Sequence, residues 1–309
     1  MEILIYGAGG IGGYFGGKLA KAGNSVSMIA RGAHLKAIKE KGLIVKSING
    51  DFTVRPKLVT DNLLEVPAPD LVILGVKSWQ ISSAAKDLKR IIGKNTIVLP
   101  LQNGVDITEK LLESLPKENV LSGLCFIVSF IEAPGIIKHA SFEPRIIFGE
   151  PTNLKSERIE KLKTIFDIAE IQSLIPENIE LEIWKKFLFI TTISGLGALT
   201  RISIDKMRQS NYLFDLMEKT ATEIKAVANA KSIPITNEHI TKAFDIIKNQ
   251  PRGGTSSTQR DIMQGKPSEL ENFNGYIVKE GERLKVKTPV NRFIYECLKP
   301  MEAEARKGF

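Results

Sequence analysis

The stretch that decides the fold lies at the start of the chain, where residues 2–6 read EILIY and residues 7–12 read GAGGIG. The first segment is apolar, as in a buried strand, and the second matches GxGxxG before a helix-compatible segment. In dinucleotide-binding folds Gly7 would permit the tight turn, Gly9 would let the backbone approach a pyrophosphate, and Gly12 would allow close helix packing. The pattern predicts a phosphate-binding loop at a helix N-terminus, and the alternative is a glycine-rich turn that binds nothing.

The end of the second predicted strand, residues 26–29, indicates which dinucleotide is bound. Folds that bind NAD usually carry an acidic residue at this point, which bonds the ribose hydroxyls. This chain has Ala30 and Arg31 there, and its next acidic residue is Glu40. A guanidinium can hold a 2′-phosphate through two hydrogen bonds, whereas a carboxylate would repel it. We therefore predict NADP(H) with Arg31 as a ligand; a solvated arginine and a flavin cofactor are the alternatives.

The first half of the chain alternates short apolar strands with helical stretches, which is typical of a parallel sheet covered by helices. Asn49-Gly50 predicts a two-residue hairpin between two short β-rich runs. The β-rich residues 121–149 are expected to complete the same sheet as antiparallel edge strands. Further strands of the sheet are predicted at residues 71–74 and 96–99.

From about residue 176 onward the pattern becomes helical. The predicted fold class is α/β: a Rossmann-type NADP(H)-binding domain at residues 1–176, followed by an all-helical substrate and catalytic domain at residues 177–309. The active site is expected in the cleft between them. Helices of the second domain are predicted at residues 179–199, 211–230, 236–249, 269–284 and 289–305.

Composition excludes several other classes of protein. The 309 residues are 43% hydrophobic and 25% charged, close to the average of globular proteins. Only two cysteines are present, and no apolar run approaches the roughly 20 residues that span a bilayer. The net charge of +8 comes from scattered lysines without a basic block, so no nucleic-acid partner is expected. The three histidines lie far apart, so no metal site is expected, and we predict a cytoplasmic protein.

Four further segments carry a resemblance to a known family. They are GVKSWQ at residues 75–80, LQNG at 101–104, IWKKF at 183–187, and a last group with TSS at 255–257, QRDI at 259–262, SEL at 268–270 and NG at 274–275. In this order and spacing the chain resembles the 2-dehydropantoate 2-reductase family, also called ketopantoate reductase, over nearly its whole length.

The resemblance implies NADPH-dependent reduction of the ketone of 2-dehydropantoate to (R)-pantoate, on the route to pantothenate and coenzyme A. It also implies a small 2-oxo acid as partner and a homodimer. Carried over position by position, it implies catalytic residues Lys186 and Glu269, and substrate-binding residues Asn103, Ser257 and Ser194. The cofactor-binding residues are then Gly7, Ala8, Gly9, Gly10, Ile11, Gly12, Arg31, Lys77 and Asn103.

The chemistry agrees with these roles, although each residue has a structural alternative. Hydride attack on a ketone develops negative charge on oxygen, so a proton donor such as Lys186 is needed there. Lys186 could instead extend to solvent from a helix edge, a role that better suits its neighbour Lys185. Asn103 could be a turn residue or a helix cap, and Ser257 could cap a helix. Glu269 could favour the positive end of a helix dipole.

The chain departs from the family pattern at two positions. The family has asparagines four and eight residues after the catalytic lysine, on one helical face, where this chain has Ile190 and Ser194. Losing an amide that bonds the substrate weakens selectivity more than it affects hydride transfer. Two alternatives to ketopantoate reduction therefore stay open: reduction of a different 2-oxo acid by the same fold, and a non-catalytic NADP(H)-binding sensor.

Overall fold

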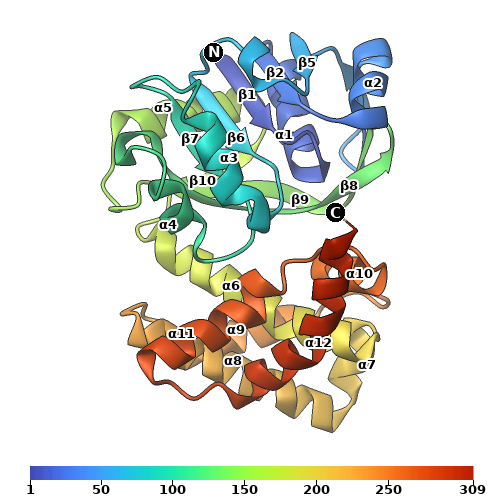
Figure 1. The fold of residues 1–309 in the computed structure, drawn as a ribbon, viewed down its shortest axis with the longest axis vertical. Coiled ribbons are helices and arrows are strands. Elements are labelled where there is room, and N and C mark those ends of the chain that lie inside the picture. Colours follow the sequence, from blue (N-terminus) through green and yellow to red (C-terminus); the bar gives the residue numbers. More distant parts are fainter. Residues whose placement is uncertain (309) are drawn as a thin grey trace. The chain divides into compact units, whose positions relative to one another are not determined.

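The computed structural model of the chain describes residues 1–308 and divides into two compact units. The first unit runs from Met1 to Ile179 and the second begins at Glu180, whereas the sequence analysis places the boundary after residue 176. The first unit is α/β and the second is helical (Figure 1). The predicted fold class is confirmed.

A five-stranded parallel sheet with strand order β5-β2-β1-β6-β7 forms the centre of the first unit. Its side chains alternate between two hydrophobic clusters: Ile3 and Ile5 join one, and Leu4 and Tyr6 the other. Burial of both faces explains why β6 and β7, and β1 after Glu2, read as continuous apolar runs. The strands are β1 (Glu2–Tyr6), β2 (Ser25–Ile29), β5 (Leu58–Thr60), β6 (Leu71–Leu74) and β7 (Ile97–Pro100).

Helices cover both faces of this sheet. Buried residues of α1 and α5 belong to one cluster, and those of α3 and α4 belong to the other. The chain continues from β1 to one neighbour, β2, and later returns to the other side as β6, so the strand order reverses beside β1. The elements are α1 (Gly10–Lys21), α2 (Gly32–Lys41), α3 (Ile81–Leu88), α4 (Ile107–Leu112) and α5 (Glu157–Ile168), with 3₁₀ turns at Leu63–Glu65, Ser78–Gln80 and Lys117–Asn119.

The prediction that residues 121–149 complete the parallel sheet is wrong, because they build a second sheet. Strand β9 pairs with β8 on one edge and with β3 and then β10 on the other, so both its edges are occupied. The glycines of α1 let this sheet pack closely, since a Cβ at Gly13 would lie 2.7 Å from Ile137. The strands are β3 (Leu43–Ser47), β4 (Phe52–Val54), β8 (Ser122–Ala133), β9 (Ile136–Gly149) and β10 (Gln172–Leu174).

The hairpin predicted at Asn49-Gly50 is confirmed, but its loop is longer than two residues. The pairing of β3 with β4 runs from Leu43 opposite Val54 to Val45 opposite Phe52. Gly50 has φ +98° and donates its N–H to the Ser47 carbonyl, while Asp51 accepts from the Ser47 N–H. These side-chain and backbone bonds close the wider turn. The Asn49-Gly50 dipeptide alone does not predict them, so it does not predict the length of the loop.

The second unit is helical throughout. The helices predicted at residues 179–199, 211–230, 236–249 and 289–305 are confirmed within two residues at each end, as α6, α8, α9 and α12. Among residues 1–308, no helix is long and apolar enough to cross a membrane. The helices are α6 (Ile179–Thr200), α7 (Ile204–Gln209), α8 (Asn211–Ala230), α9 (Asn237–Lys248), α10 (Ser257–Met263), α11 (Tyr276–Leu284) and α12 (Pro289–Lys307).

The single helix predicted at residues 269–284 is wrong in its first part. A π-helical turn, Glu271–Gly275, precedes α11, and the Gly275 N–H bonds to the Leu270 carbonyl. The wider turn presents the Asn274 amide to α6, where a Cβ at Gly195 would overlap the Asn274 Oδ1. Tertiary packing against a glycine therefore stabilises a local conformation that helix periodicity does not predict.

Candidate functional site

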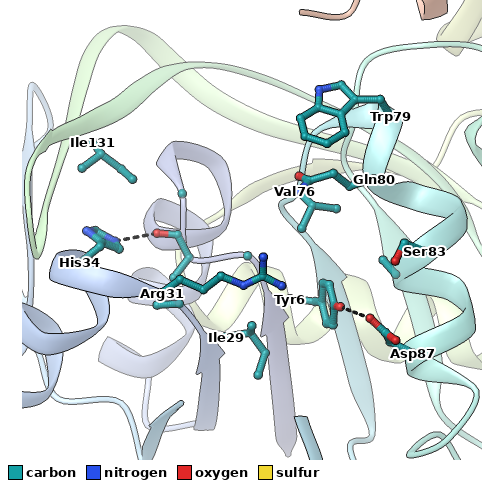
Figure 2. Close-up of a pocket in the computed structure, with 15 residues that line it drawn as sticks. Tyr6, Ile29, Arg31, His34, Val76, Trp79, Gln80, Ser83, Asp87 and Ile131 are labelled. Atoms are coloured by element: carbon teal, nitrogen blue, oxygen red, sulfur yellow. Dashed lines mark hydrogen bonds between the residues drawn. The ribbon is translucent and has the colours of Figure 1, made fainter. Parts of the chain in front are cut away.

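A pocket of about 450 Å³ opens at the carboxyl ends of β1 and β2 in the first unit (Figure 2). This edge of an open α/β sheet, beside the strand where the order reverses, is where such folds bind ligands. The volume lies within the usual range of small-molecule sites. The wall includes the loop after β1, the end of β2 and one face of α3, with Gly7, Ala8, Gly9, Arg31, His34, Ser83 and Asp87 among its residues.

The glycines of the loop have different structural tasks. Gly7 has φ +104°, and a Cβ at Gly12 would overlap the Gly7 carbonyl oxygen, so both positions need glycine for the turn and for packing of α1. A Cβ at Gly10 would overlap the backbone of Ser129 in β8. At Gly9 the nearest atom that a Cβ would meet is the Gly75 oxygen, at 3.9 Å. The protein thus leaves open the side of Gly9 that a phosphate would approach.

Within the described residues 1–308, the pocket brings together only part of the predicted cofactor set. Gly7, Ala8, Gly9 and Arg31 line it, whereas Gly10, Ile11 and Gly12 belong to α1. The two groups are nevertheless adjacent. The Ala8 N–H is bonded to the Ile29 carbonyl at 2.9 Å, which fixes the loop to the end of β2, and α1 begins directly after the loop. The N-terminal N–H groups of α1 are therefore held at the loop, as an anion site requires.

Arg31 immediately precedes α2, and its backbone is extended, with φ −138° and ψ 160°. Its side chain is exposed, and the guanidinium points across the pocket towards Tyr6 (Figure 2). The position of Arg31 after β2 therefore fits a cationic group at the ribose end of a dinucleotide, as predicted from the residues that follow this strand.

Asp87 is a pocket residue that the sequence analysis missed. It comes from α3 and accepts a hydrogen bond from the Tyr6 hydroxyl at 2.9 Å. Burial, together with this bond, raises the pKa of Tyr6 to about 12, so the hydroxyl stays protonated and keeps donating at pH 7. Spacing from the loop could not have found this acid, because it reaches the pocket through tertiary packing of α3.

Lys77 and Asn103 follow β6 and β7 at the same edge of the sheet, and both are partly buried. Neither belongs to the wall of the pocket as the described residues form it. The helix-cap alternative for Asn103 is wrong, because α4 begins after Asp106. The neighbouring Gln102, buried to 5% exposure, donates from Nε2 to the Leu74 carbonyl at 2.8 Å and to the Val76 carbonyl at 3.0 Å. Gln102 therefore ties the Asn103 loop to the loop that carries Lys77.

Replacing Gln102 with leucine is expected to lower the free energy of unfolding by about 1–3 kcal/mol, because two carbonyls lose their donor in a buried setting. Urea denaturation of the purified protein measures this change. Gln172→Leu, at an exposed position of β10, is the matched control and is expected to change stability by less than about 0.5 kcal/mol. Equal stability of the two variants would contradict the role of Gln102.

The long helix α6 carries the predicted catalytic lysine and the two positions at which the chain departs from the family pattern. Lys186, Ile190 and Ser194 are spaced by four residues and therefore share one face of the helix. Lys186 is partly exposed, and Trp184 and Phe187, which stand before and after it in the sequence, are each about 1% exposed. Ser194 is buried to 1% exposure.

Lys185 forms an ion pair on the surface of α6. Its ammonium pairs with Glu182 at 2.5 Å, and both side chains are partly solvent-exposed. A pair of this kind on a helix surface contributes little to stability. Lys185 thus has the surface role that was considered as the alternative for Lys186.

The helix-cap alternative for Ser257 is also wrong. The N-cap of α10 is Ser256, whose hydroxyl accepts from the Gln259 N–H at 3.0 Å. Ser257 is the first residue of the helix and is partly exposed. Gln259 packs against α6, since a Cβ at Gly197 would lie 2.7 Å from its Oε1. The start of α10 is therefore held close to the C-terminal part of α6.

Glu269 is buried to 4% exposure, in the segment before the π-helical turn. The backbone next to it is fixed by Ser268, whose hydroxyl donates to Glu302 at 2.5 Å and whose N–H is bonded to the same carboxylate. Arg306 pairs with Glu302 at 2.8 Å and neutralises its charge. This buried network holds the Glu269 segment in one conformation.

Residues 1–308 contain no group of three or more histidine, cysteine or carboxylate side chains arranged to hold a metal ion. His139, one of the three histidines, is fully buried and bonded to Ser47 at 2.8 Å.

Comparison with known families identifies the class and then the family. The description "Ketopantoate reductase PanE/ApbA" matches residues 3–153, and "Ketopantoate reductase PanE/ApbA C terminal" matches residues 178–302. The α/β unit with its GAGGIG loop belongs to the dinucleotide-fold oxidoreductases. Within that class, the chain belongs to the ketopantoate reductase family, as its sequence motifs predict.

Similar proteins cover the chain from end to end. A 2-dehydropantoate 2-reductase of Pyrococcus abyssi is 32% identical, with 98% of each chain aligned. An oxidoreductase of Bacillus subtilis, YkpB, is 30% identical over 98% of this chain and 100% of its own.

Two solved structures have the same fold as this chain. A ketopantoate reductase of Ralstonia eutropha superposes with a TM-score of 0.92 at 28% identity, covering 99% of this chain and 100% of the other. A D-mandelate dehydrogenase, solved with NADH and anilino(oxo)acetate, has a TM-score of 0.91 at 24% identity, with 99% of each chain covered.

Proposed function

We propose that this protein reduces the ketone of 2-dehydropantoate to (R)-pantoate with NADPH. The observation that carries the proposal is the pocket at the end of β1 and β2, where the open side of Gly9 and the Arg31 guanidinium occur in a chain of the ketopantoate reductase family. The proposal includes a cytoplasmic homodimer that serves pantothenate and coenzyme A biosynthesis.

The residues of the pocket fit a nicotinamide dinucleotide. The space beside Gly9 and the N-terminus of α1 suit a pyrophosphate, and Arg31 suits a 2′-phosphate. We assign Lys77 and Asn103, at the ends of β6 and β7, to the reactive end of the cofactor, because they extend the same sheet edge beyond the pocket. When bound, the cofactor supplies the hydride.

Lys186, Ser257 and Glu269 of the second unit act on the substrate in this proposal. The Lys186 ammonium stabilises the charge that develops on the ketone oxygen and gives it a proton. Lys186 is partly removed from solvent, which strengthens this interaction. Ser257 and Asn103 bond substrate oxygens, Ser194 provides a further hydroxyl, and Glu269 accepts from a substrate hydroxyl.

A second candidate, reduction of a different 2-oxo acid, is favoured by one observation. Ile190 and Ser194 stand where the family pattern has asparagines, on the same face of α6 as Lys186. A related fold, the D-mandelate dehydrogenase, was solved with anilino(oxo)acetate, which is a 2-oxo acid derivative. The proton transfer by Lys186 is common to both candidates, and only the substrate pocket differs.

The experiment that tests the proposal is NADPH oxidation by the purified protein with ketopantoate, beside NADH and a set of other 2-oxo acids. We expect a kcat/KM for ketopantoate of about 10⁴ M⁻¹s⁻¹ or more with NADPH. Preferential use of NADH would show that Asp87, rather than Arg31, decides the choice of cofactor. Turnover of another 2-oxo acid alone would establish the second candidate, and cofactor binding without any turnover would indicate a sensor.

Replacing Ile190 with asparagine is expected to raise kcat/KM for ketopantoate by about 10-fold or more, because an amide at this partly exposed position would bond a substrate oxygen that isoleucine cannot. Steady-state kinetics with ketopantoate and with pyruvate measure the change in selectivity. Ile190→Leu is the control, since it keeps an apolar side chain of equal size. An unchanged kcat/KM for Ile190→Asn would remove the reason for considering a different substrate.

A further inference from the structure

His34 contacts the phosphate-binding loop from α2. Its Nε2 lies 2.9 Å from the Ala8 carbonyl oxygen, the contact drawn in Figure 2. On the other side of the ring, the Gly135 N–H donates to Nδ1 at 2.9 Å. Gly135 is the turn residue between β8 and β9, and its own carbonyl accepts from the Ile44 N–H of β3. The histidine therefore connects the loop to the second sheet.

These two bonds determine the protonation state of the ring. A backbone N–H can only donate, so Nδ1 must carry a lone pair, and the proton is on Nε2, which donates to Ala8. Burial lowers the pKa of His34 below its usual value, in agreement with a neutral ring at pH 7. One tautomer thus satisfies both contacts.

The Ala8 carbonyl and the Gly9 N–H belong to the same planar peptide, so fixing one fixes the other. The oxygen is the negative end of that peptide dipole and would repel a phosphate if the peptide turned round. His34 binds this oxygen and so keeps the positive end, the Gly9 N–H, available to an anion at the open side of Gly9.

We propose that His34 is a positioning residue for cofactor binding: it orients the Ala8–Gly9 peptide of the phosphate-binding loop and is itself oriented by the β8–β9 turn. The ligand concerned is the pyrophosphate of a dinucleotide, so this inference rests on the proposed function. To orient this peptide, residue 34 must provide a hydrogen-bond donor at the position that Nε2 occupies.

Two substitutions separate the contacts of the ring. The amide nitrogen of His34→Gln can reach the place of Nε2 and retain the bond to Ala8, whereas the shorter amide of His34→Asn reaches only the place of Nδ1. We expect His34→Asn to raise the Kd for NADPH by about tenfold, the loss of one good hydrogen bond, and His34→Gln by about threefold or less. Isothermal titration of the full chain with NADPH measures both, and kcat at saturating NADPH is expected to stay unchanged.

The matched control is His239→Gln, which changes a histidine that caps α9 in the second unit and is expected to leave the Kd unchanged. A purely structural role would lower the unfolding midpoint of both His34 variants without separating their affinities. Equal Kd values for the native chain, His34→Asn and His34→Gln would overturn the inference, as would tighter binding by the asparagine variant.

If His34→Asn does not fold, the titration of His34→Gln decides: a Kd within about threefold of native supports the inference, and a loss of more than about tenfold overturns it. The proposed function fails separately. In that case the native chain binds neither NADPH nor NADH in the same titration.

Discussion

Replacing Lys186 with methionine is expected to lower kcat for ketone reduction by about 10²- to 10⁴-fold, the usual contribution of a positioned proton donor. Methionine keeps much of the apolar stem of this partly exposed lysine and removes only the ammonium, so the fold should persist. The Kd for NADPH is expected to stay at the native value, because the loop and Arg31 belong to the first unit. Steady-state kinetics and a binding titration measure the two quantities.

Lys185→Met is the control for this prediction. Lys185 immediately precedes Lys186 on α6, and its ammonium forms a partly exposed pair with Glu182. We expect a change in kcat of less than about twofold, since an exposed pair of this kind is worth little. Native turnover by Lys186→Met, or equal losses in the two variants, would contradict the assignment of Lys186 as proton donor.

Two glycines of the GAGGIG segment are expected to respond to alanine in different ways, one through stability and the other through cofactor affinity. In Gly12→Ala the new methyl would overlap the Gly7 carbonyl oxygen, which is backbone and cannot move without opening the turn. We expect a loss of about 3 kcal/mol or more in the free energy of unfolding, the upper range for overpacking. Urea denaturation monitored by circular dichroism measures this loss.

In Gly9→Ala the protein itself has room for the methyl, whose nearest neighbour would be the Gly75 oxygen at 3.9 Å. The backbone of Gly9, with φ −73°, also suits alanine. We expect native stability but a Kd for NADPH raised by at least about tenfold, because the methyl occupies the side that the pyrophosphate approaches. Native affinity in this variant would mean that the phosphates bind elsewhere, and a destabilised Gly9→Ala would contradict the open geometry.

The sequence alone determined the features that depend on local pattern. The apolar run of β1, the glycines after it and the start of α1 are contiguous, so their strand-loop-helix order could be predicted directly. Arg31 is likewise placed by its distance along the chain from the loop. Family membership followed from short motifs in a fixed order, and the long helices α6, α8 and α12 from their periodicity and length.

Only the tertiary structure decided the features that join distant segments. Asp87 enters the pocket from α3, Gln102 bonds the neighbouring loop, and His34 meets the turn at Gly135. The second sheet and the π-helical turn before α11 belong to the same group, since each forms through packing against α1 or α6.

The physical reason is the range of the interactions. A strand, a tight turn or a helix follows from backbone preferences and side-chain periodicity within about 20 residues, and these preferences can be read along the chain. Strand pairing, packing against glycines and bonds from side chains to remote carbonyls depend on which segments meet. In this protein the loop that is proposed to bind phosphate is local, whereas the residues that orient it come from elsewhere in the fold.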